Sequence, residues 1–287
     1  MTCPACKKED SRLYMREDPY ILHACKNCGL VFRQDRVSEV ESHFAGGSEV
    51  DEAYRKLAGV VDEVNQRLAH GIIEFLRRAG LREGSVLEVG CGTAALGKTI
   101  RRSYPDLRYV GIEPTKRFSE HDNRQEASNV FASVAASGIE KHSQAALVMS
   151  HVLEHVPDPV EFLASHLLYV KPGGAAYIEV PNEQWKKIFS RLMRFVRGDA
   201  STVFSGHINF FTARSLAYAL RSAGLEIVRI EKPPIGGSAD LIRKLSGDAE
   251  IFAVNKKITF IHEFFKVFPL DRLLGYGLVV RAVGRTR

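Results

Sequence analysis

Residues 86–97 read V-L-E-V-G-C-G-T-A-A-L-G and combine a short apolar segment, an acid and a glycine pair. The small residues from Thr93 onward are suited to the start of a helix. Glycine permits backbone conformations and close approaches that a side chain would block, and the first turn of a helix offers unpaired backbone amides. The stretch therefore predicts a strand, a ligand-binding turn and a helix in succession.

Strand and helix signals alternate on both sides of this stretch. Apolar residues recur at helical spacing over residues 55–80, where Gly80 ends the pattern. The later signals predict strands at 108–113, 129–131, 145–150, 175–180, 225–230 and 278–283, and helices at 159–170 and 212–223. Such alternation is typical of an α/β fold, with a parallel sheet that is covered by helices on both faces.

Composition and charge limit the class of protein. Hydrophobic residues make up 45% of the 287-residue chain, which is enough for a substantial core. No stretch approaches the ~20 apolar residues of a membrane-spanning helix. The start, Met1-Thr2-Cys3-Pro4, has no signal-peptide pattern, so we expect a cytoplasmic protein. The net charge of +6 favours anionic partners such as RNA, but scattered surface lysines and arginines explain it more simply.

Four of the five cysteines form two C-x-x-C pairs near the N-terminus. Cys3 and Cys6 are followed, after eighteen residues, by Cys25 and Cys28. This spacing is typical of a Cys₄ zinc site, in which two tight turns each supply two thiolates. A closed site of this kind is structural, and the predicted zinc ribbon either stabilises the N-terminus or recognises a substrate or RNA. Cys91 lies apart, and we expect it to be a small buried residue.

Two cofactors fit the glycine turn, and Glu88 distinguishes them. Residues 90–95 match the G-x-G-x-x-A dinucleotide pattern, and Glu113 stands 21 residues after Gly92, where a ribose-binding acid is expected. However, Glu88 ends an apolar strand, and a buried carboxylate is costly without a cationic or hydrogen-bonding partner. It would repel the phosphates of a dinucleotide. The ammonium and sulfonium groups of S-adenosylmethionine would instead stabilise it, so we predict that cofactor.

Several further motifs follow in order: V-G-I-E-P at 110–114, V-L-E-H-V-P-D-P at 152–159, V-K-P-G-G at 170–174, H-I-N-F-F-T at 207–212 and S-L-A-Y-A-L-R-S-A-G-L at 215–225. In these motifs, over residues 70–232, the chain resembles the class I S-adenosylmethionine-dependent methyltransferases. The resemblance implies a doubly wound, mostly parallel seven-stranded sheet of the Rossmann-like type. The expected domains are a zinc ribbon (1–40), a linker and helix (41–80), the cofactor-binding core (81–232) and a helical insertion or lid with a last strand (233–287).

The resemblance also implies which residues bind the cofactor: Glu88, Gly90, Cys91, Gly92, Glu113, Pro114, Ser133, Ser150 and His151. Within this set, Glu88 and the two glycines hold the methionine part and Glu113 holds the ribose. The chain departs from the family at Ala94, where a third glycine is usual. A methyl group there costs about 1 kcal/mol if the turn needs a positive φ. A second departure is that residues 132–135 contain no acid to contact adenine.

The four-cysteine head resembles the zinc-ribbon methyltransferases of polysaccharide, deoxysugar and natural-product biosynthesis. Related sugar C-methyltransferases place a histidine near the reacting carbon in a segment similar to residues 205–209, although this chain lacks their large C-terminal domain. We therefore expect O- or C-methylation of a sugar, glycan or related metabolite. His155 and His207 are the candidate general bases, because imidazole accepts protons near neutral pH. A packing role is the alternative for each histidine.

Other interpretations stay open. Residues 151–155 resemble a segment of ubiquinone-type O-methyltransferases, some of which have E-x-x-E-H and bind a divalent metal. His151, Glu154 and His155 could therefore hold a second metal or line the site beside the transferred methyl group. The apolar segment 258–268 could pack on the sheet or a second subunit, cover the substrate, or lie on a membrane surface. An rRNA methyltransferase and a binding protein that has lost catalysis are the alternative functions.

Overall fold

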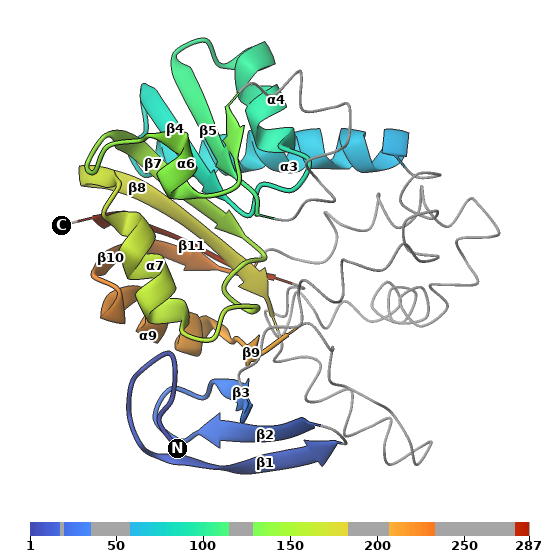
Figure 1. Ribbon diagram of the computed structural model, residues 1–287, viewed down its shortest axis with the longest axis vertical. Helices are drawn as coiled ribbons and strands as arrows, with labels where there is room; N and C mark the ends of the chain where they lie inside the picture. Colours follow the sequence, from blue (N-terminus) through green and yellow to red (C-terminus); the bar gives the residue numbers. More distant parts are fainter. Residues whose placement is uncertain (18–19, 36–57, 115–128, 183–206, 233–278, 287) are drawn as a thin grey trace.

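The computed structural model describes residues 1–17, 20–35, 58–114, 129–182, 207–232 and 279–286. They form two sheets, a small one at the N-terminus and a larger one that makes the core (Figure 1). The small sheet has the order β1-β2-β3-β9 and is antiparallel. Its strands are β1 (Ser11–Glu17), β2 (Tyr20–Cys25), β3 (Val31–Arg33) and β9 (Asn209–Phe210).

The core sheet has seven strands in the order β10-β11-β8-β7-β4-β5-β6. They are β4 (Gly84–Val89), β5 (Leu107–Ile112), β6 (Val130–Phe131), β7 (Gln144–Ser150), β8 (Val170–Pro181), β10 (Leu225–Glu231) and β11 (Val279–Thr286). The strands from β8 to β6 are parallel, whereas β11 is antiparallel to both of its neighbours. The predicted mostly parallel α/β sheet is confirmed.

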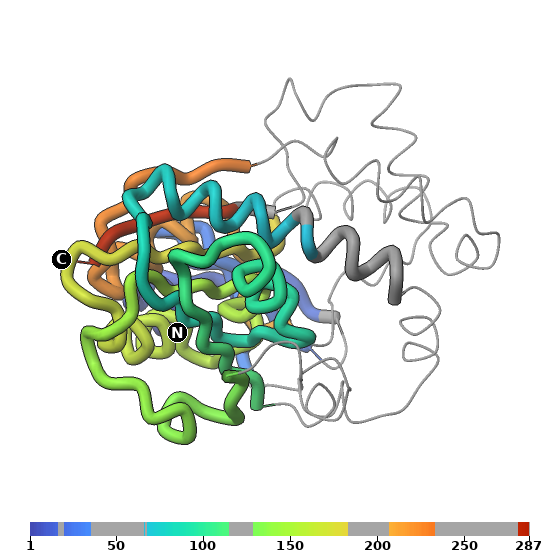
Figure 2. The backbone as a smooth tube through the Cα atoms, turned by 90° about the horizontal axis from the view of Figure 1, so that it is seen from above, coloured from blue at the N-terminus to red at the C-terminus, as the bar shows by residue number. Residues whose placement is uncertain are grey.

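Helices cover both faces of this sheet because its buried strands carry apolar residues on both sides. Val86 and Val148 pack with α3 (Ala58–Arg78) and α4 (Ala95–Ser103). Their neighbours Leu87 and Leu147 face the opposite way and pack with α7 (Pro159–Leu167) and α9 (Ala213–Ser222). A short helix, α6 (Val134–Ser137), follows β6. Seen from above, α3 and α4 lie in front of the sheet (Figure 2).

The segment around residue 170 differs from the prediction. The helix predicted over 159–170 ends at Leu167, and Val170 already belongs to β8. The Pro-Gly-Gly sequence at 172–174 lies inside β8 rather than before it. Its register against β7 jumps from Gln144 opposite Val170 to Ala146 opposite Ala175, so the extra residues form an irregularity within the strand.

The segment 258–268 and most of residues 233–287 lie outside the described residues, so the alternatives for that region stay predictions. The final strand is described and, as β11, lies between β8 and β10. Among the helices of the described ranges, none is long and apolar enough to cross a membrane.

Tyr109 gives a test of how tightly the α4 face is packed. A Cβ at Gly97 of α4 would lie 2.4 Å from the Tyr109 ring, whereas one at Gly71 of α3 would meet nothing within 4 Å. We expect Gly71→Ala to raise the free energy of unfolding by about 0.5–1 kcal/mol through helix propensity. Gly97→Ala should instead lower it by about 1–3 kcal/mol through overpacking. Urea denaturation measures both, and a stabilising Gly97→Ala would contradict the packing.

Candidate functional site

The glycine turn lies at the carboxyl end of β4. The next strand in the chain, β5, lies on one side of β4, and β7 lies on the other side. Ligands of open α/β sheets bind at this kind of switch point. The amides of Gly90 and Cys91 both donate to the carbonyl of Ile112, at 2.8 and 3.2 Å. A side chain at Gly92 would project where no described atom lies within 4 Å, which leaves room for a ligand against the backbone.

Ala94, where the family usually has a glycine, has a positive φ. Its φ of 55° and ψ of 37° are left-handed, it is fully buried, and it immediately precedes α4. An alanine pays roughly 1–2 kcal/mol for this conformation, which glycine adopts freely. The turn into α4 therefore stores strain at the cofactor loop.

Glu88 is buried on β4 and has a partner that the sequence analysis missed. The Tyr109 hydroxyl of β5 donates to Glu88 Oε2 at 2.6 Å. Burial raises the pKa of Glu88 to about 8; the Tyr109 hydrogen bond opposes this shift, and the charge of Glu113 adds to it. In the structure without ligand, the Glu88 carboxyl is therefore largely protonated at neutral pH, and a cationic ligand would favour its ionised form.

Two glycines make room for the Tyr109 ring. A Cβ on Gly97 or on Gly111 would lie 2.4 and 2.7 Å, respectively, from the nearest Tyr109 atom. Gly111 is also the residue of β5 directly opposite Glu88. The Tyr109 contact therefore depends on the pairing of β4 with β5, which places a glycine beside the buried acid.

Glu113 braces the glycine turn. It follows β5, is buried, and its Oε2 accepts from the Gly92 amide at 2.9 Å. The Gly92 amide therefore fixes the position of the Glu113 carboxylate, which is the group predicted to contact the ribose. Pro114 follows it and is exposed. Cys91 is buried, as expected, and its sulfur packs toward Gly111, so any ligand contact would come from its backbone.

The two predicted serines already make contacts within the protein. Ser133, after β6, caps α6 by accepting from the Ala136 amide at 3.2 Å. Ser150, at the end of β7, donates to Glu179 Oε1 at 3.2 Å. Both lie at carboxyl ends of strands, so their location agrees with the prediction while their cofactor contacts stay a prediction.

His151 follows β7 in a left-handed conformation, with φ of 57°, and its side chain is half exposed. Its Nδ1 lies 3.3 Å from Glu154 Oε1 and its Nε2 lies 3.6 Å from Glu179 Oε1. The ring therefore stands between two carboxylates at the end of the sheet.

Glu154, His155 and His207 form the most compact cluster of ionisable groups at this edge. One polar side-chain atom of each lies within 4.8 Å of the others, and the two imidazole rings are 4.9 Å apart at 75°. Glu154 is 1% exposed, and neither of its carboxylate oxygens has a hydrogen-bond partner in the described part of the chain. The structure therefore adds His207 to the residues that the sequence analysis grouped, since His151 also lies beside Glu154.

The loop that carries Glu154 and His155 contacts the glycine turn. A Cβ on Gly90 would lie 2.6 Å from the Val152 side chain, so the loop that follows β7 packs directly on the glycine loop. An imidazole beside a buried carboxylate is placed to accept a proton, because the carboxylate stabilises the imidazolium that forms. The edge thus joins a turn for a cationic ligand to a candidate acid–base pair.

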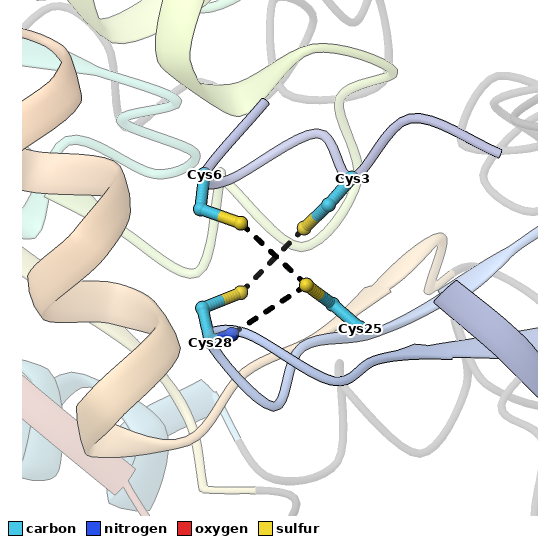
Figure 3. Close-up of side chains that lie close together, drawn as sticks. All are labelled: Cys3, Cys6, Cys25 and Cys28. Atoms are coloured by element: carbon cyan, nitrogen blue, oxygen red, sulfur yellow. Dashed lines mark hydrogen bonds between the residues drawn. The ribbon is translucent and has the colours of Figure 1, made fainter. Parts of the chain in front are cut away.

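The four N-terminal cysteines converge on one point (Figure 3). Cys3 lies 3.5 Å from Cys28 and Cys6 lies 3.5 Å from Cys25, sulfur to sulfur, and all four sulfurs lie within 4.8 Å of one another. Tetrahedral zinc with bonds of 2.3 Å would space the sulfurs by about 3.8 Å. The contact between Cys3 and Cys28 lowers the pKa of the Cys3 thiol and raises that of Cys28, because the two sulfurs share one proton more readily than two.

Comparison with known proteins agrees with this arrangement. The family model for a methyltransferase domain matches residues 61–230, which span the core sheet from α3 to β10. The chain belongs to this methyltransferase family. The match includes the glycine turn and the loop after β7, so the core is an S-adenosylmethionine-dependent methyltransferase domain.

Curated relatives match part of the chain. The C-methyltransferase NovU of Streptomyces niveus is 25% identical over 66% of this chain and 44% of its own length. A ubiquinone biosynthesis O-methyltransferase of Cupriavidus pinatubonensis is 25% identical over 53% of this chain and 64% of its own. The match thus spans about half the length of these relatives. A methyltransferase structure from Archaeoglobus fulgidus, 17% identical with a TM-score of 0.52 over 83% of this chain and 100% of its own, shares the fold.

The raised pKa of Glu88 predicts how stability depends on pH. The folded protein holds this proton up to pH of about 8, whereas an unfolded glutamate releases it near 4.5. The stabilising contribution is therefore complete below pH 4.5 and is lost as pH rises toward 8. We expect cofactor-free wild type to lose at least about 1 kcal/mol relative to Glu88→Gln between pH 5 and 8. A difference that stays constant across urea titrations would contradict the assignment.

Proposed function

We propose that the protein transfers a methyl group from S-adenosylmethionine to oxygen or carbon of a small-molecule acceptor, namely a sugar, a glycan or a related metabolite. The observation that carries the proposal is the cluster of Glu154, His155 and His207. Its loop contacts the glycine turn through Val152, and Glu88 and Glu113 lie beside that turn. The printed names of the relatives include one C-methyltransferase and one O-methyltransferase. Both reactions need the acceptor to lose a proton, which such a cluster could accept.

The residues of the turn fit the cofactor. Glu88, whose proton is held by burial, would ionise against the ammonium group, and the open side of Gly92 would receive the methionine part. Glu113 would hold the ribose. When bound, S-adenosylmethionine supplies an electrophilic methyl group on a positively charged sulfur.

The histidine pair would remove the acceptor proton. The bound cofactor would supply the methyl group and keep the electron pair of the broken bond on its sulfur, and the residues of the loop after β7 would receive the proton that the acceptor loses. The acceptor's proton passes to His155 or His207, and Glu154 stabilises the imidazolium. The loop would also hold the acceptor in line with the methyl group, which supplies much of the rate.

The sugar class of acceptor is inferred from sequence resemblance. The four-cysteine head and the segment that contains His207 resemble those of zinc-ribbon sugar methyltransferases. We also propose that the cysteine cluster binds a structural zinc ion, because its four sulfurs have the spacing of a closed tetrahedral site. The cluster of Glu154, His155 and His207 offers ligands for a divalent metal as a competing role, because one ligand atom of each lies within 4.8 Å of the others.

Histidine variants test the proposed chemistry. We expect His155→Ala or His207→Ala to lower turnover by about 100-fold, because the proton acceptor is lost, while calorimetry shows unchanged S-adenosylmethionine affinity. S-adenosylhomocysteine formation with a panel of sugar nucleotides and polyols measures turnover. His142→Ala is the control, since His142 precedes β7 at the opposite end of that strand. Full turnover in both variants would exclude the histidines as bases, and absence of cofactor binding in wild type would favour a non-catalytic protein.

Metal analysis tests the cysteine site. We expect about one zinc ion per chain in wild type, none in Cys25→Ala and about one in the control Cys91→Ala, since four thiolates close the coordination shell. Plasma emission spectrometry under reducing conditions measures this. Zinc-free wild type would contradict the assignment. A second equivalent that survives Cys25→Ala but not Glu154→Gln would place a metal at the histidine cluster.

A further inference from the structure

The cysteine domain, residues 1–17 and 20–35, pairs with β9, which begins two residues after the candidate base His207. β3 of the cysteine domain pairs with β9 of the core, with Val31 opposite Phe210 and Phe32 opposite Asn209. The Arg33 amide extends the ladder by donating to the Ile208 carbonyl at 2.9 Å. β9 has two residues and lies at the edge of the sheet, so β3 is its strand partner in the described part of the chain.

Residues 208 and 209 also form hydrogen bonds with the loop after β7. The amides of Ile208 and Asn209 donate to the Glu154 carbonyl at 2.8 and 3.0 Å. The Asn209 side-chain amide donates to the carbonyls of Val156, at 2.7 Å, and Leu153, at 3.3 Å. Residues 207–210 are thus a layer between the cysteine domain and the loop that carries Glu154 and His155.

Each cysteine turn also contacts the core through a side chain. Lys7, directly after Cys6, forms an ion pair with Asp158, the N-cap of α7. In the second turn, the carbonyl of Asn27 accepts from Arg214 Nη2 of α9 at 2.6 Å. These two helices lie next to each other on one face of the core sheet (Figure 1).

The conformation of Lys7 is consistent with a role for its side chain. Lys7 has φ of 59° and follows the second cysteine of its pair, as Gly29 does with φ of 79° in the other turn. Glycine adopts this conformation freely, whereas lysine pays roughly 1–2 kcal/mol. A lysine at this position gains the contact with Asp158 that a glycine would lack.

The cysteines themselves are part of the core packing. Cys3, Cys25 and Cys28 are at most 3% exposed and belong to the same hydrophobic cluster as Leu153 and Phe211. A change in the geometry of the cysteine turns would therefore affect the packing of Leu153, which precedes Glu154, and of Phe211, which follows β9. The glycine turn after β4 is held by β5 instead, through the Ile112 carbonyl and Glu113.

We propose that metal binding by the four cysteines positions His207 and the loop 151–158 through β9, so that the cysteine domain is a positioning element of the active site. This inference rests on the proposed zinc site and on the proposed role of the histidines. We expect a larger effect on acceptor chemistry than on cofactor binding, because β3 and the loop after β7 hydrogen-bond to residues 208–210, whereas the hydrogen bonds that hold the glycine turn come from Ile112 and Glu113.

Hydrogen exchange of the full-length protein tests this directly. With a chelator under reducing conditions, we expect metal removal to speed exchange in peptides covering 207–212 and 153–158 by about tenfold or more. Exchange over 86–92 and 107–112 should change by less than about twofold, and cofactor affinity by less than about threefold. Unchanged exchange over 207–212 would overturn the proposal, as would a uniform rise with loss of cofactor binding, which would make the metal a general stabiliser.

Variants that still bind the metal can distinguish a positioning role from an effect on folding. Lys7→Ala combined with Arg214→Ala removes both side-chain contacts. Lys26→Ala is the matched control, because Lys26 pairs at 2.9 Å with Asp10 inside the cysteine domain. We expect the double variant to keep its zinc and cofactor affinity and to speed exchange over 207–212 by about threefold or more. The ring signal of His207 in an NMR spectrum should also move, and Arg214→Lys should restore part of both effects.

Kinetics distinguish positioning from a merely structural role. In the double variant, kcat should fall with an unchanged KM for S-adenosylmethionine, and Lys26→Ala should match wild type. A double variant that keeps its zinc and is indistinguishable from Lys26→Ala in exchange and in the His207 signal would overturn the proposal. Failure of the proposed function would appear separately, as wild type that binds no cofactor, whatever the exchange results.

Discussion

The central place of β4 in the parallel sheet is the constraint on which the site depends. Because β5 and β7 flank β4 in the same direction, their carboxyl ends bring Glu88, Glu113 and the loop after Ser150 to one edge. The turn after β4 must then fold tightly enough for its amides to reach the Ile112 carbonyl. The left-handed Ala94 is a consequence of that tight turn, since α4 begins at the next residue.

Much of this edge could be predicted because it follows from local patterns. Alternating apolar segments identified the strands, and parallel strands necessarily place their ends together. The cost of burying Glu88 pointed to a cation, and the structure supports that reasoning through the raised pKa. At Ala94 the sequence showed the departure from glycine but left open whether the turn needs a positive φ, and the structure gives Ala94 a φ of 55°.

The missed features depend on contacts between residues distant in sequence. Tyr109 reaches Glu88 because two strands pair in a register that puts Gly111 beside the acid. His207 joins Glu154 and His155 because β9, which follows it, pairs with β3 in the small sheet and not with a strand of the core sheet. No periodicity predicts a two-residue strand that joins a different sheet. The same limit applies at residues 172–174, where a turn-like sequence is taken up within a long strand.

Two buried acids of the site, Glu88 and Glu154, have different roles. Glu88 has a tyrosine hydroxyl and keeps its proton, so a cation at the glycine turn would gain from releasing that proton. Glu154 has no hydrogen-bond partner in the described chain and faces imidazoles, so it gains from a proton that arrives on a histidine. One acid therefore favours binding of a cationic ligand and the other favours proton transfer. The segment that pairs with β3 also holds the Glu154 carbonyl through the amides of Ile208 and Asn209, so under our proposal metal binding by the cysteines acts mainly on the second acid and its chemistry.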